Sequence, residues 1–444
     1  MTTPPKISWS DLRGARVGLF GLGVEGRANL ARLTELSTVP VLVDDRPPSA
    51  TVEGLDVLAS AAGGLDALAA CEVVVKSPGI SRHRPDVVAL EAAGVAVAGG
   101  LGLWMEEVDR TRVVCVTGTK GKSTTAALCG HLLEGLGYRA AVTGNIGRPP
   151  WDPGSGPDPE VWVVETSSFQ ATDLASAPPV VAVTSLDADH LDWHGDAETY
   201  VADKLSMCRR PGAELTVAAD GAALRRQRAR LGPTVRWVDL GDPELDGGWT
   251  GALGLLGAHN HRNALVARAV LVALGARGAS DEAAVAAAAA GFAALESRLR
   301  LLGCAGGVAF YDDSLATNVL PTVVALEALG ERRVALIVGG HDRGIDYRPL
   351  AEALARRAAT TFVVTLPANG PRIHETIDAL AGPSPEVLDA GDLDAAVARA
   401  AAWARPDGAV LLSPAAPSFG QFADYRDRSA AFAEAAARCG ALAP

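Results

Sequence analysis

The segment 113–125, VVCVTGTKGKSTT, constrains the fold of this chain more than any other. Its apolar run predicts a buried strand, which leads through a loop containing Gly118 and Gly121 into a helix that begins near Ser123. Glycine lets the backbone curl so that successive N–H groups face one anion, at the positive end of the helix. The segment therefore predicts an ATP phosphate site, in which Lys122 reaches the β- and γ-phosphates and the Ser123 hydroxyl binds Mg²⁺.

The spacing of this loop differs from that of the general P-loop. The general pattern has four residues between its first glycine and the G-K-[ST] triplet, whereas two residues separate Gly118 from Gly121. A glycine-rich turn that binds nothing is the alternative, but two lysines and a Ser-Thr pair behind a strand favour phosphate. The predicted ATP contacts from the loop are Gly118, Thr119, Lys120, Gly121, Lys122, Ser123 and Thr124.

Length and composition limit the classes of protein that the chain can belong to. At roughly 100–200 residues per domain, 444 residues predict three domains. A net charge of −12 without a long basic run argues against a nucleic-acid partner. The six cysteines show no C-x-x-C spacing, and no leader or membrane-length apolar stretch is visible. We therefore expect a cytoplasmic protein that is not inserted in a membrane.

The order of apolar runs and glycines predicts three α/β units in series. In each unit, apolar strands end in glycine or polar residues and alternate with segments of helical periodicity. This alternation is typical of parallel sheets. We expect a Rossmann-like domain over 1–108, a central P-loop ATPase-like domain with a mainly parallel sheet over 109–296, and a Rossmann-like C-terminal domain over 297–444.

The first unit carries a second glycine loop. GLGVEG, at 21–26, fits G-x-G-x-x-G, and the acidic residue Asp44 follows at about the 20-residue distance of a dinucleotide-binding site. NAD, another diphosphate, and simple packing of a helix on a strand all remain open for this loop.

Polar residues end two predicted strands of the central unit. Glu165 ends one and His190 the other, and parallel strands would bring both to the ATP loop, where Mg²⁺ needs hard ligands. His190 alone would more often be a capping or core histidine. Lys204 lies on a predicted amphipathic helix, and by pattern alone it is a solvated lysine.

The third unit offers a carboxylate and a cation. Asp313 ends a predicted strand, where it can either deprotonate an incoming amine or cap the next helix, and both remain open. Arg343 follows a strand through two glycines, in a position that suits the capture of a carboxylate or phosphate.

With these segments laid out, the chain resembles the Mur ligases over essentially its full length, most closely the glutamate-adding (MurD) type. The matching blocks are TGTKGKST (117–124), TGNIG (143–147), ETSSFQ (165–170), DADHLDWHG (187–195), YVADK (200–204), HNHRN (259–263), ESR (296–298), DDSLATN (312–318) and LSPAAPSF (412–419).

The resemblance implies an activity and its partners. ATP would phosphorylate the L-alanine carboxylate of UDP-N-acetylmuramoyl-L-alanine, and the amine of glutamate would attack the acyl phosphate, in peptidoglycan precursor synthesis. The first domain would bind UDP rather than NAD. ATP, two Mg²⁺ ions and a carbamylated Lys204 are implied, and we expect a monomer.

The resemblance also implies roles for individual residues. The catalytic group is Lys122, His190, Lys204 and Asp313. The metal group is Ser123, Glu165, His190 and Lys204 as its carbamate. Asn260, Asn263 and Arg298 would contact the nucleotide. The UDP-substrate group is Val24, Glu25, Asp44, Arg46, Ser77, Gly79, Asn145, Ser167 and Gln170. The glutamate group is Leu315, Thr317, Arg343, Ser418 and Tyr425.

One position departs from the family pattern. The usual motif reads D-S-K-A-T-N, and its lysine helps to hold a glutamate carboxylate, whereas this chain has Leu315. D-glutamate is the family default, and the departure suggests L-glutamate as the alternative. Another amino-acid-adding Mur ligase, a folate polyglutamating relative and a non-catalytic nucleotide-dependent binding protein are the competing readings.

Overall fold

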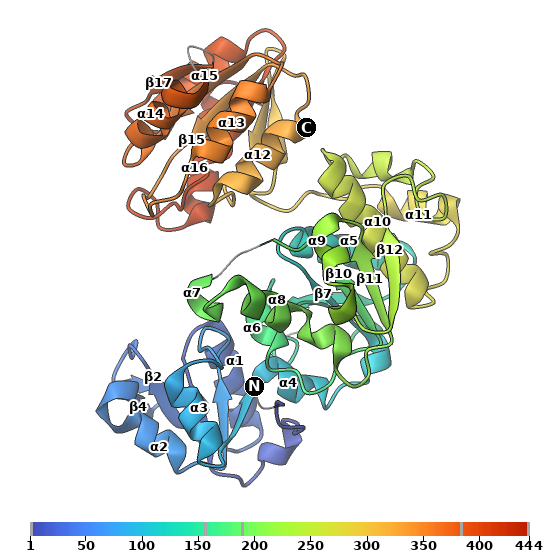
Figure 1. Cartoon of the computed structure of the whole chain (residues 1–444), viewed down its shortest axis with the longest axis vertical. Helices are drawn as coiled ribbons and strands as arrows, with labels where there is room; N and C mark the ends of the chain where they lie inside the picture. Colours follow the sequence, from blue (N-terminus) through green and yellow to red (C-terminus); the bar gives the residue numbers. More distant parts are fainter. Residues whose placement is uncertain (1–2, 155, 157, 188–190, 382–384, 442–444) are drawn as a thin grey trace. The chain divides into compact units, whose positions relative to one another are not determined.

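The computed structural model describes residues 3–154, 156, 158–187, 191–381 and 385–441. Within these residues the strands form three six-stranded sheets that alternate with helices along the chain (Figure 1). The pairing is parallel apart from one edge pair in the first sheet and one in the third. This arrangement confirms the predicted α/β class with three sheets in series.

The first sheet has the order β3-β4-β2-β1-β5-β6, with β1 at its centre because the first strand of the chain is apolar on both faces. Its strands are β1 (Val17–Phe20), β2 (Val41–Asp44), β3 (Thr51–Val52), β4 (Leu55–Ala59), β5 (Val73–Lys76) and β6 (Ala96–Gly99). Its helices are α1 (Val24–Glu35), α2 (Leu65–Ala69), α3 (Pro85–Ala92) and α4 (Gly100–Met105).

The second sheet has the order β12-β11-β10-β7-β9-β8, and all of its printed pairings are parallel. Its strands are β7 (Val113–Thr117), β8 (Ala140–Gly144), β9 (Val161–Glu165), β10 (Val180–Val183), β11 (Leu215–Ala219) and β12 (Thr234–Val238). Its helices are α5 (Lys122–Gly135), α6 (Ser168–Ala171), α7 (Leu191–His194), α8 (Ala197–Leu205), α9 (Ala222–Arg226), α10 (Ala258–Ala273) and α11 (Glu282–Ala289).

The third sheet has the order β13-β14-β18-β15-β16-β17. Its strands are β13 (Arg300–Ala305), β14 (Val308–Asp312), β15 (Val334–Val338), β16 (Thr361–Thr365), β17 (Glu386–Asp389) and β18 (Ala409–Leu412). Its helices are α12 (Val319–Ala328), α13 (Arg348–Arg356), α14 (Gly370–Ala381), α15 (Leu393–Ala404) and α16 (Tyr425–Arg438). Apolar clusters pack on both faces of this sheet, as expected for strands that are continuously apolar.

The chain divides into two compact units. One comprises Met1–Leu253 and His259–Phe292 and holds the first two sheets; the other comprises Gly254–Ala258 and Ala293–Pro444 and holds the third. The predicted boundaries at 108/109 and 296/297 stay predictions.

The first two sheets share one apolar core. Trp9 and Trp104 from the first part of the chain belong to the same buried cluster as Trp151 and Trp162. Trp104 meets Trp162 edge to face at 5.3 Å, and the indole N–H of Trp151 donates to the buried Asn29 side chain at 2.9 Å. Burial of large aromatic surface explains why these two sheets form one unit.

The six cysteines are all unpaired, and four of them are buried, as expected for small core residues. None of the helices in the described ranges is both long and apolar enough to cross a bilayer.

Candidate active site

The phosphate loop joins β7 to α5 and needs glycine at two positions. Gly118 has φ +139°, and a Cβ there would lie 2.2 Å from Thr184 Oγ1. Gly121 has φ +86°, and a Cβ there would lie 2.5 Å from Asn263 Oδ1. Both the left-handed backbone and the lack of space exclude larger residues. The strand, loop and helix predicted from 113–125 are therefore confirmed.

Groups from the end of β10 and from α8 fix the shape of the loop. Thr119 Oγ1 lies 2.8 Å from the Tyr200 hydroxyl and accepts from the backbone N–H of Asp187 at 2.9 Å. The Lys120 N–H donates to Ser185 Oγ at 2.8 Å. The loop is thus tied to the polar segment that follows β10, as the strand-end pattern predicts for a parallel sheet.

Two lysines converge on the carbonyl groups of the loop. Lys122 Nζ donates to the oxygens of Gly118 and Thr119, each at 3.0 Å. Lys204 Nζ donates to the Gly118 oxygen at 2.9 Å, and the Lys204 residue is only 2% exposed. The pattern-based reading of Lys204 as a solvated lysine is therefore wrong, because α8 packs its lysine inward against the loop.

Glu165 lies at the same edge of the second sheet. It ends β9, pairs in register with Val116 of β7 and is 2% exposed. Its Oε1 accepts from the Asn145 side chain at 2.9 Å. Its Oε2 is buried and meets no hydrogen-bond partner within the described part of the chain. A buried carboxylate oxygen of this kind beside a phosphate loop fits a hard cation such as Mg²⁺.

Three other members of the predicted metal and nucleotide groups are described in this unit. Ser123 is buried in the first turn of α5. Asn263 of α10 lies against the loop at Gly121, and its Nδ2 donates to Asn260 Oδ1 at 3.4 Å. The structure thus places Asn263 against the phosphate loop, with Asn260 hydrogen-bonded to it. His190 lies outside the described residues.

The predicted UDP-substrate residues come from both sheets of this unit, and three of them are hydrogen-bonded in a chain. Gln170 donates through Nε2 to Glu25 Oε1, and its Oε1 accepts from the Ser167 N–H at 3.0 Å. Ser167 is the N-cap of α6 and forms a capping box with Gln170. Burial raises the pKa of Glu25 to about 7, while the Gln170 hydrogen bond opposes the shift.

Other residues of this group shape the glycine loop of the first sheet. Asp44 accepts the backbone N–H groups of Leu22 at 2.7 Å and Arg46 at 2.8 Å. Ser77 donates through Oγ to the Gly21 oxygen at 2.7 Å. Asp44 and Ser77 therefore hold the loop backbone.

The remaining residues of the group lie around this loop. Val24 is 80% exposed at the start of α1, and the Arg46 side chain is exposed. The Gly79 oxygen accepts from the indole N–H of Trp193 at 3.3 Å. Val24 and Arg46 are thus accessible to a ligand at the carboxyl end of the sheet.

In the other compact unit, Asp313 follows β14 and is almost completely buried. Its Oδ1 accepts from the Leu299 N–H at 3.1 Å, and its Oδ2 accepts from Ser413 Oγ at 2.7 Å. Burial raises the pKa of Asp313 to about 7; Ser413 and Leu299 oppose the shift through their hydrogen bonds, and the neighbouring Asp312 adds to it. The side chain does not cap α12, whose N-cap is Asn318.

The predicted glutamate group surrounds the ends of β14, β15 and β18 in this unit. Leu315 is half-buried, with its N–H donating to the Ser297 oxygen at 3.1 Å, and Thr317 is exposed. Arg343 is exposed, with its guanidinium 5.7 Å from the centre of the Phe419 ring. Ser418 is buried, and Tyr425 is half-buried at the start of α16. Arg298 is half-buried, and its positive charge lowers the pKa of Asp313.

A buried arginine joins two of these segments, and sequence reasoning missed it. Arg428 of α16 is 0% exposed and donates to the Ser314 oxygen at 2.8 Å and the Ala416 oxygen at 3.1 Å. Burial lowers its pKa to about 10, so it stays cationic at neutral pH. Tyr200 and Ser413 were missed as well. A helical arginine or a strand-end serine carries no local signal of such partners.

Comparison with known protein families matches two parts of the chain. The model described as "Mur ligase middle domain" matches residues 116–235, and the model described as "Mur ligase, glutamate ligase domain" matches residues 297–416. The first match covers the phosphate loop, Glu165 and Lys204, and the second covers Asp313.

Curated relatives resemble the chain over nearly all of its length. A protein of Xanthomonas euvesicatoria named UDP-N-acetylmuramoyl-L-alanine--L-glutamate ligase is 40% identical over 454 residues, covering 96% of both chains. A Micromonospora protein of the same name is 41% identical over 452 residues, covering 96% of this chain and 97% of its own.

Solved structures share the fold at low identity. The UDP-N-acetylmuramate-alanine ligase MurC of Thermotoga maritima has a TM-score of 0.58 and 18% identity, covering 96% of this chain and 99% of its own. The MurF ligase of Thermotoga maritima in complex with ADP has a TM-score of 0.56 and 14% identity, covering 97% of each chain. These likenesses concern the architecture alone.

Proposed function

Because the chain belongs to the Mur ligase family, we propose that it is an ATP-dependent ligase that joins glutamate to the L-alanine carboxylate of UDP-N-acetylmuramoyl-L-alanine. The observation that carries this proposal is the meeting of the phosphate loop, Glu165 and Lys204 at one edge of the second sheet. A protein that only bound nucleotide would not need a buried lysine against that loop.

The phosphate loop would orient the γ-phosphoryl group of ATP towards the substrate carboxylate. Backbone N–H groups at the start of α5 and the Lys122 ammonium would face the phosphates, where negative charge accumulates during transfer. The attack of the carboxylate on the γ-phosphorus gives an acyl phosphate and ADP. Asn263, which lies against the loop, and Asn260, which is hydrogen-bonded to it, would contact the nucleotide.

The residues around the loop fit a metal-binding role. Ser123, Glu165 and a carbamylated Lys204 would hold Mg²⁺, which neutralises phosphate charge when it is bound. The buried Oε2 of Glu165 supports this assignment. Carbamylation would convert the buried Lys204 cation into an anion whose oxygens could bind Mg²⁺, which an ammonium cannot do.

Asp313 would take the proton from the glutamate amine before the amine attacks the acyl carbon. A carboxyl whose pKa is about 7 is poised to accept a proton at neutral pH. The hydrogen bonds from Ser413 and Leu299 hold the carboxyl in one orientation. Phosphate then leaves the tetrahedral intermediate, and the amide bond remains.

We propose L-glutamate as the amino acid, in place of the D-glutamate that is the family default. Two features support L-glutamate. The curated relatives carry L-glutamate in their names, and Leu315 stands where the usual motif has a carboxylate-binding lysine. The polar side chains that this proposal leaves for the glutamate are Thr317, Arg343, Ser418 and Tyr425.

The test is a coupled assay of ADP and phosphate release with ATP, Mg²⁺ and UDP-N-acetylmuramoyl-L-alanine, offered L- and D-glutamate separately. We expect release that requires both the muramoyl substrate and L-glutamate, with the amide product detected by mass spectrometry. Release that is indifferent to the amino acid would reject the ligase assignment. Release with D-glutamate alone would reject only the choice of enantiomer. A monomeric state and a cytoplasmic location also belong to the proposal.

A further inference from the structure

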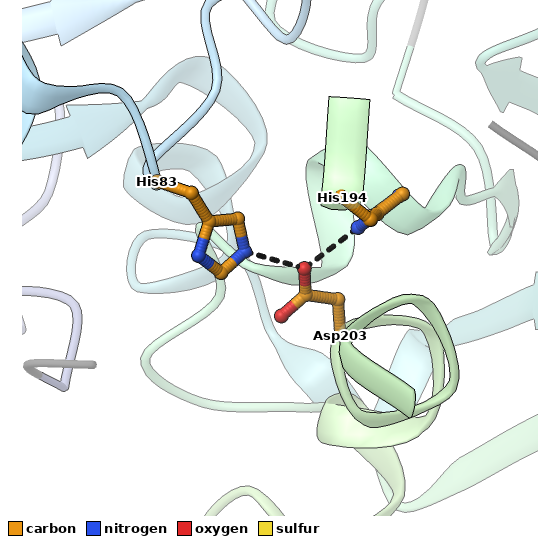
Figure 2. A group of neighbouring side chains, drawn as sticks. All are labelled: His83, His194 and Asp203. Carbon is orange, nitrogen blue, oxygen red and sulfur yellow. Dashed lines mark hydrogen bonds and ion pairs between the residues drawn. The ribbon is translucent and has the colours of Figure 1, made fainter. Parts of the chain in front are cut away.

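Three side chains from separate segments of the first compact unit meet at one point. His83 lies between β5 and α3, His194 is the last residue of α7, and Asp203 lies on α8. Figure 2 shows the two imidazoles directed at the same carboxylate oxygen. Asp203 Oδ2 lies 2.7 Å from His83 Nε2 and 2.7 Å from His194 Nδ1.

The burial of the cluster makes it unusual. The side chains of Asp203 and His194 are fully buried, whereas 27% of the His83 side chain is exposed. Asp203 Oδ1 is buried and has no hydrogen-bond partner among the residues that the structure describes. A buried carboxylate oxygen without a partner is costly, and a cation would offset that cost.

The surroundings resemble the support of a metal-binding histidine. The second ring nitrogen of His194, Nε2, lies 2.9 Å from Ser168 Oγ. A histidine that binds metal through one nitrogen commonly directs the other at a hydrogen-bonding partner, which fixes the ring. Trp193 stacks on Phe169 with ring centroids 4.4 Å apart and lies 5.9 Å from His83, so aromatic surface encloses one side of the cluster.

We propose that His83, His194 and Asp203 bind one transition-metal cation of the Zn²⁺ class. The candidate ligand atoms lie within 4.8 Å of one another. Zinc bonds of about 2.0–2.2 Å would place these atoms roughly 3.3 Å apart, so each needs to move by less than about 1 Å. Two imidazoles select Zn²⁺ or Co²⁺ over Mg²⁺, which prefers oxygen ligands.

This site is distinct from the proposed Mg²⁺ site and does not rest on the proposed ligase activity. It would tie the loop after β5 to α7 and α8, and thus link the first sheet to the helix that carries Lys204. We therefore expect the cation to stabilise the first compact unit, since a ligand that binds only the folded state raises its melting temperature.

The test is calorimetric titration of the metal-free full-length protein with Zn²⁺ in an excess of Mg²⁺, without nucleotide. We expect one Zn²⁺ per chain, and His83→Gln should weaken the affinity by roughly 10–100-fold or more. His131→Gln, a histidine of the same unit outside the cluster, and Glu165→Gln, in the proposed Mg²⁺ site, should bind as the wild type does.

Cobalt spectra and melting curves give a second measurement. Co²⁺ should produce a visible absorption band in the wild-type protein that His83→Gln lacks. Zn²⁺ should raise the melting temperature of the wild type but not of Asp203→Asn, whose folding is checked by circular dichroism. No stoichiometric Zn²⁺, or equal binding by wild type and His83→Gln, would show that the cluster is only a hydrogen-bonded link between the two sheets.

Discussion

The Lys204 ammonium donates a hydrogen bond of 2.9 Å to the Gly118 carbonyl, so a lysine from α8 lies directly against the phosphate loop. The Tyr200 hydroxyl, one helical turn earlier, reaches Thr119 of the same loop at 2.8 Å. The helix α8 therefore supports the loop at two adjacent residues, and any change of charge at Lys204 acts where ATP phosphates are proposed to bind.

Replacement of this lysine should abolish most of the activity. We expect Lys204→Ala to lower ADP release roughly 10²–10³-fold, because it removes a charged group preorganised at the phosphates. Added acetate or formate should restore part of the loss by taking the place of the carbamate. Lys6→Ala, at an exposed lysine, should change nothing. Near wild-type activity without rescue would exclude a catalytic Lys204.

Asp313→Asn should raise the stability of the protein although it removes nearly all of the activity. The folded pKa of about 7 lies above the unfolded value of about 3.9. The contribution of Asp313 to stability therefore falls as pH rises from about 4 to about 7, where the unfolded carboxyl ionises and the folded one does not. At pH 7.5 we expect Asp313→Asn to be more stable by roughly 1–3 kcal/mol, with the gain vanishing near pH 4.

The same variant should be nearly inactive, since asparagine cannot accept the amine proton. The kcat/KM of the wild type should rise with pH through about 7, as Asp313 ionises. Calorimetric melting and a pH–rate profile measure the two effects, and Asp407→Asn, at an exposed aspartate, is the matched control. A stabilised variant with full activity would contradict the role of Asp313 as a base.

Glu25 should make the binding of the UDP substrate depend on pH. Its pKa of about 7 leaves the carboxyl neutral in acid and anionic in base, where it repels a diphosphate. We expect the KM for UDP-N-acetylmuramoyl-L-alanine to rise between pH 6 and 8.5. Glu25→Gln should flatten that profile, whereas Glu35→Gln, at the exposed end of the same helix, should retain it. An unchanged profile in Glu25→Gln would remove Glu25 from the substrate site.

Leu315→Lys tests the amino-acid site. Restoring the lysine of the usual motif adds a cation for a glutamate carboxylate, so we expect the ratio of D- to L-glutamate use to rise roughly tenfold or more. Leu320→Lys places the same charge on an exposed position of α12 and should leave the ratio unchanged. The measurement is kcat/KM for each enantiomer. If the ratio of D- to L-glutamate use were the same in Leu315→Lys as in Leu320→Lys, Leu315 would not select the amino acid.

The sequence by itself determined the parts of the site that are formed by residues close to one another in the sequence. An apolar run, two glycines, lysines and a following helical pattern define the phosphate loop locally, so Gly118, Gly121 and Lys122 could be predicted from their order in the chain. The structure gives both glycines the positive φ that this loop requires. The rule that parallel strands align their carboxyl ends placed Glu165 and Asp313 at sheet edges in the same way.

Only the tertiary structure decided which distant groups meet. Lys204 is buried because α8 packs on the loop from 86 residues away, and His83 contacts Asp203 across 120 residues. A helical pattern shows which face of a helix is apolar, but it does not show which polar group of another segment contacts that face. Burial then sets the charge of Glu25 and Asp313, because desolvation depends on the whole fold rather than on the adjoining residues.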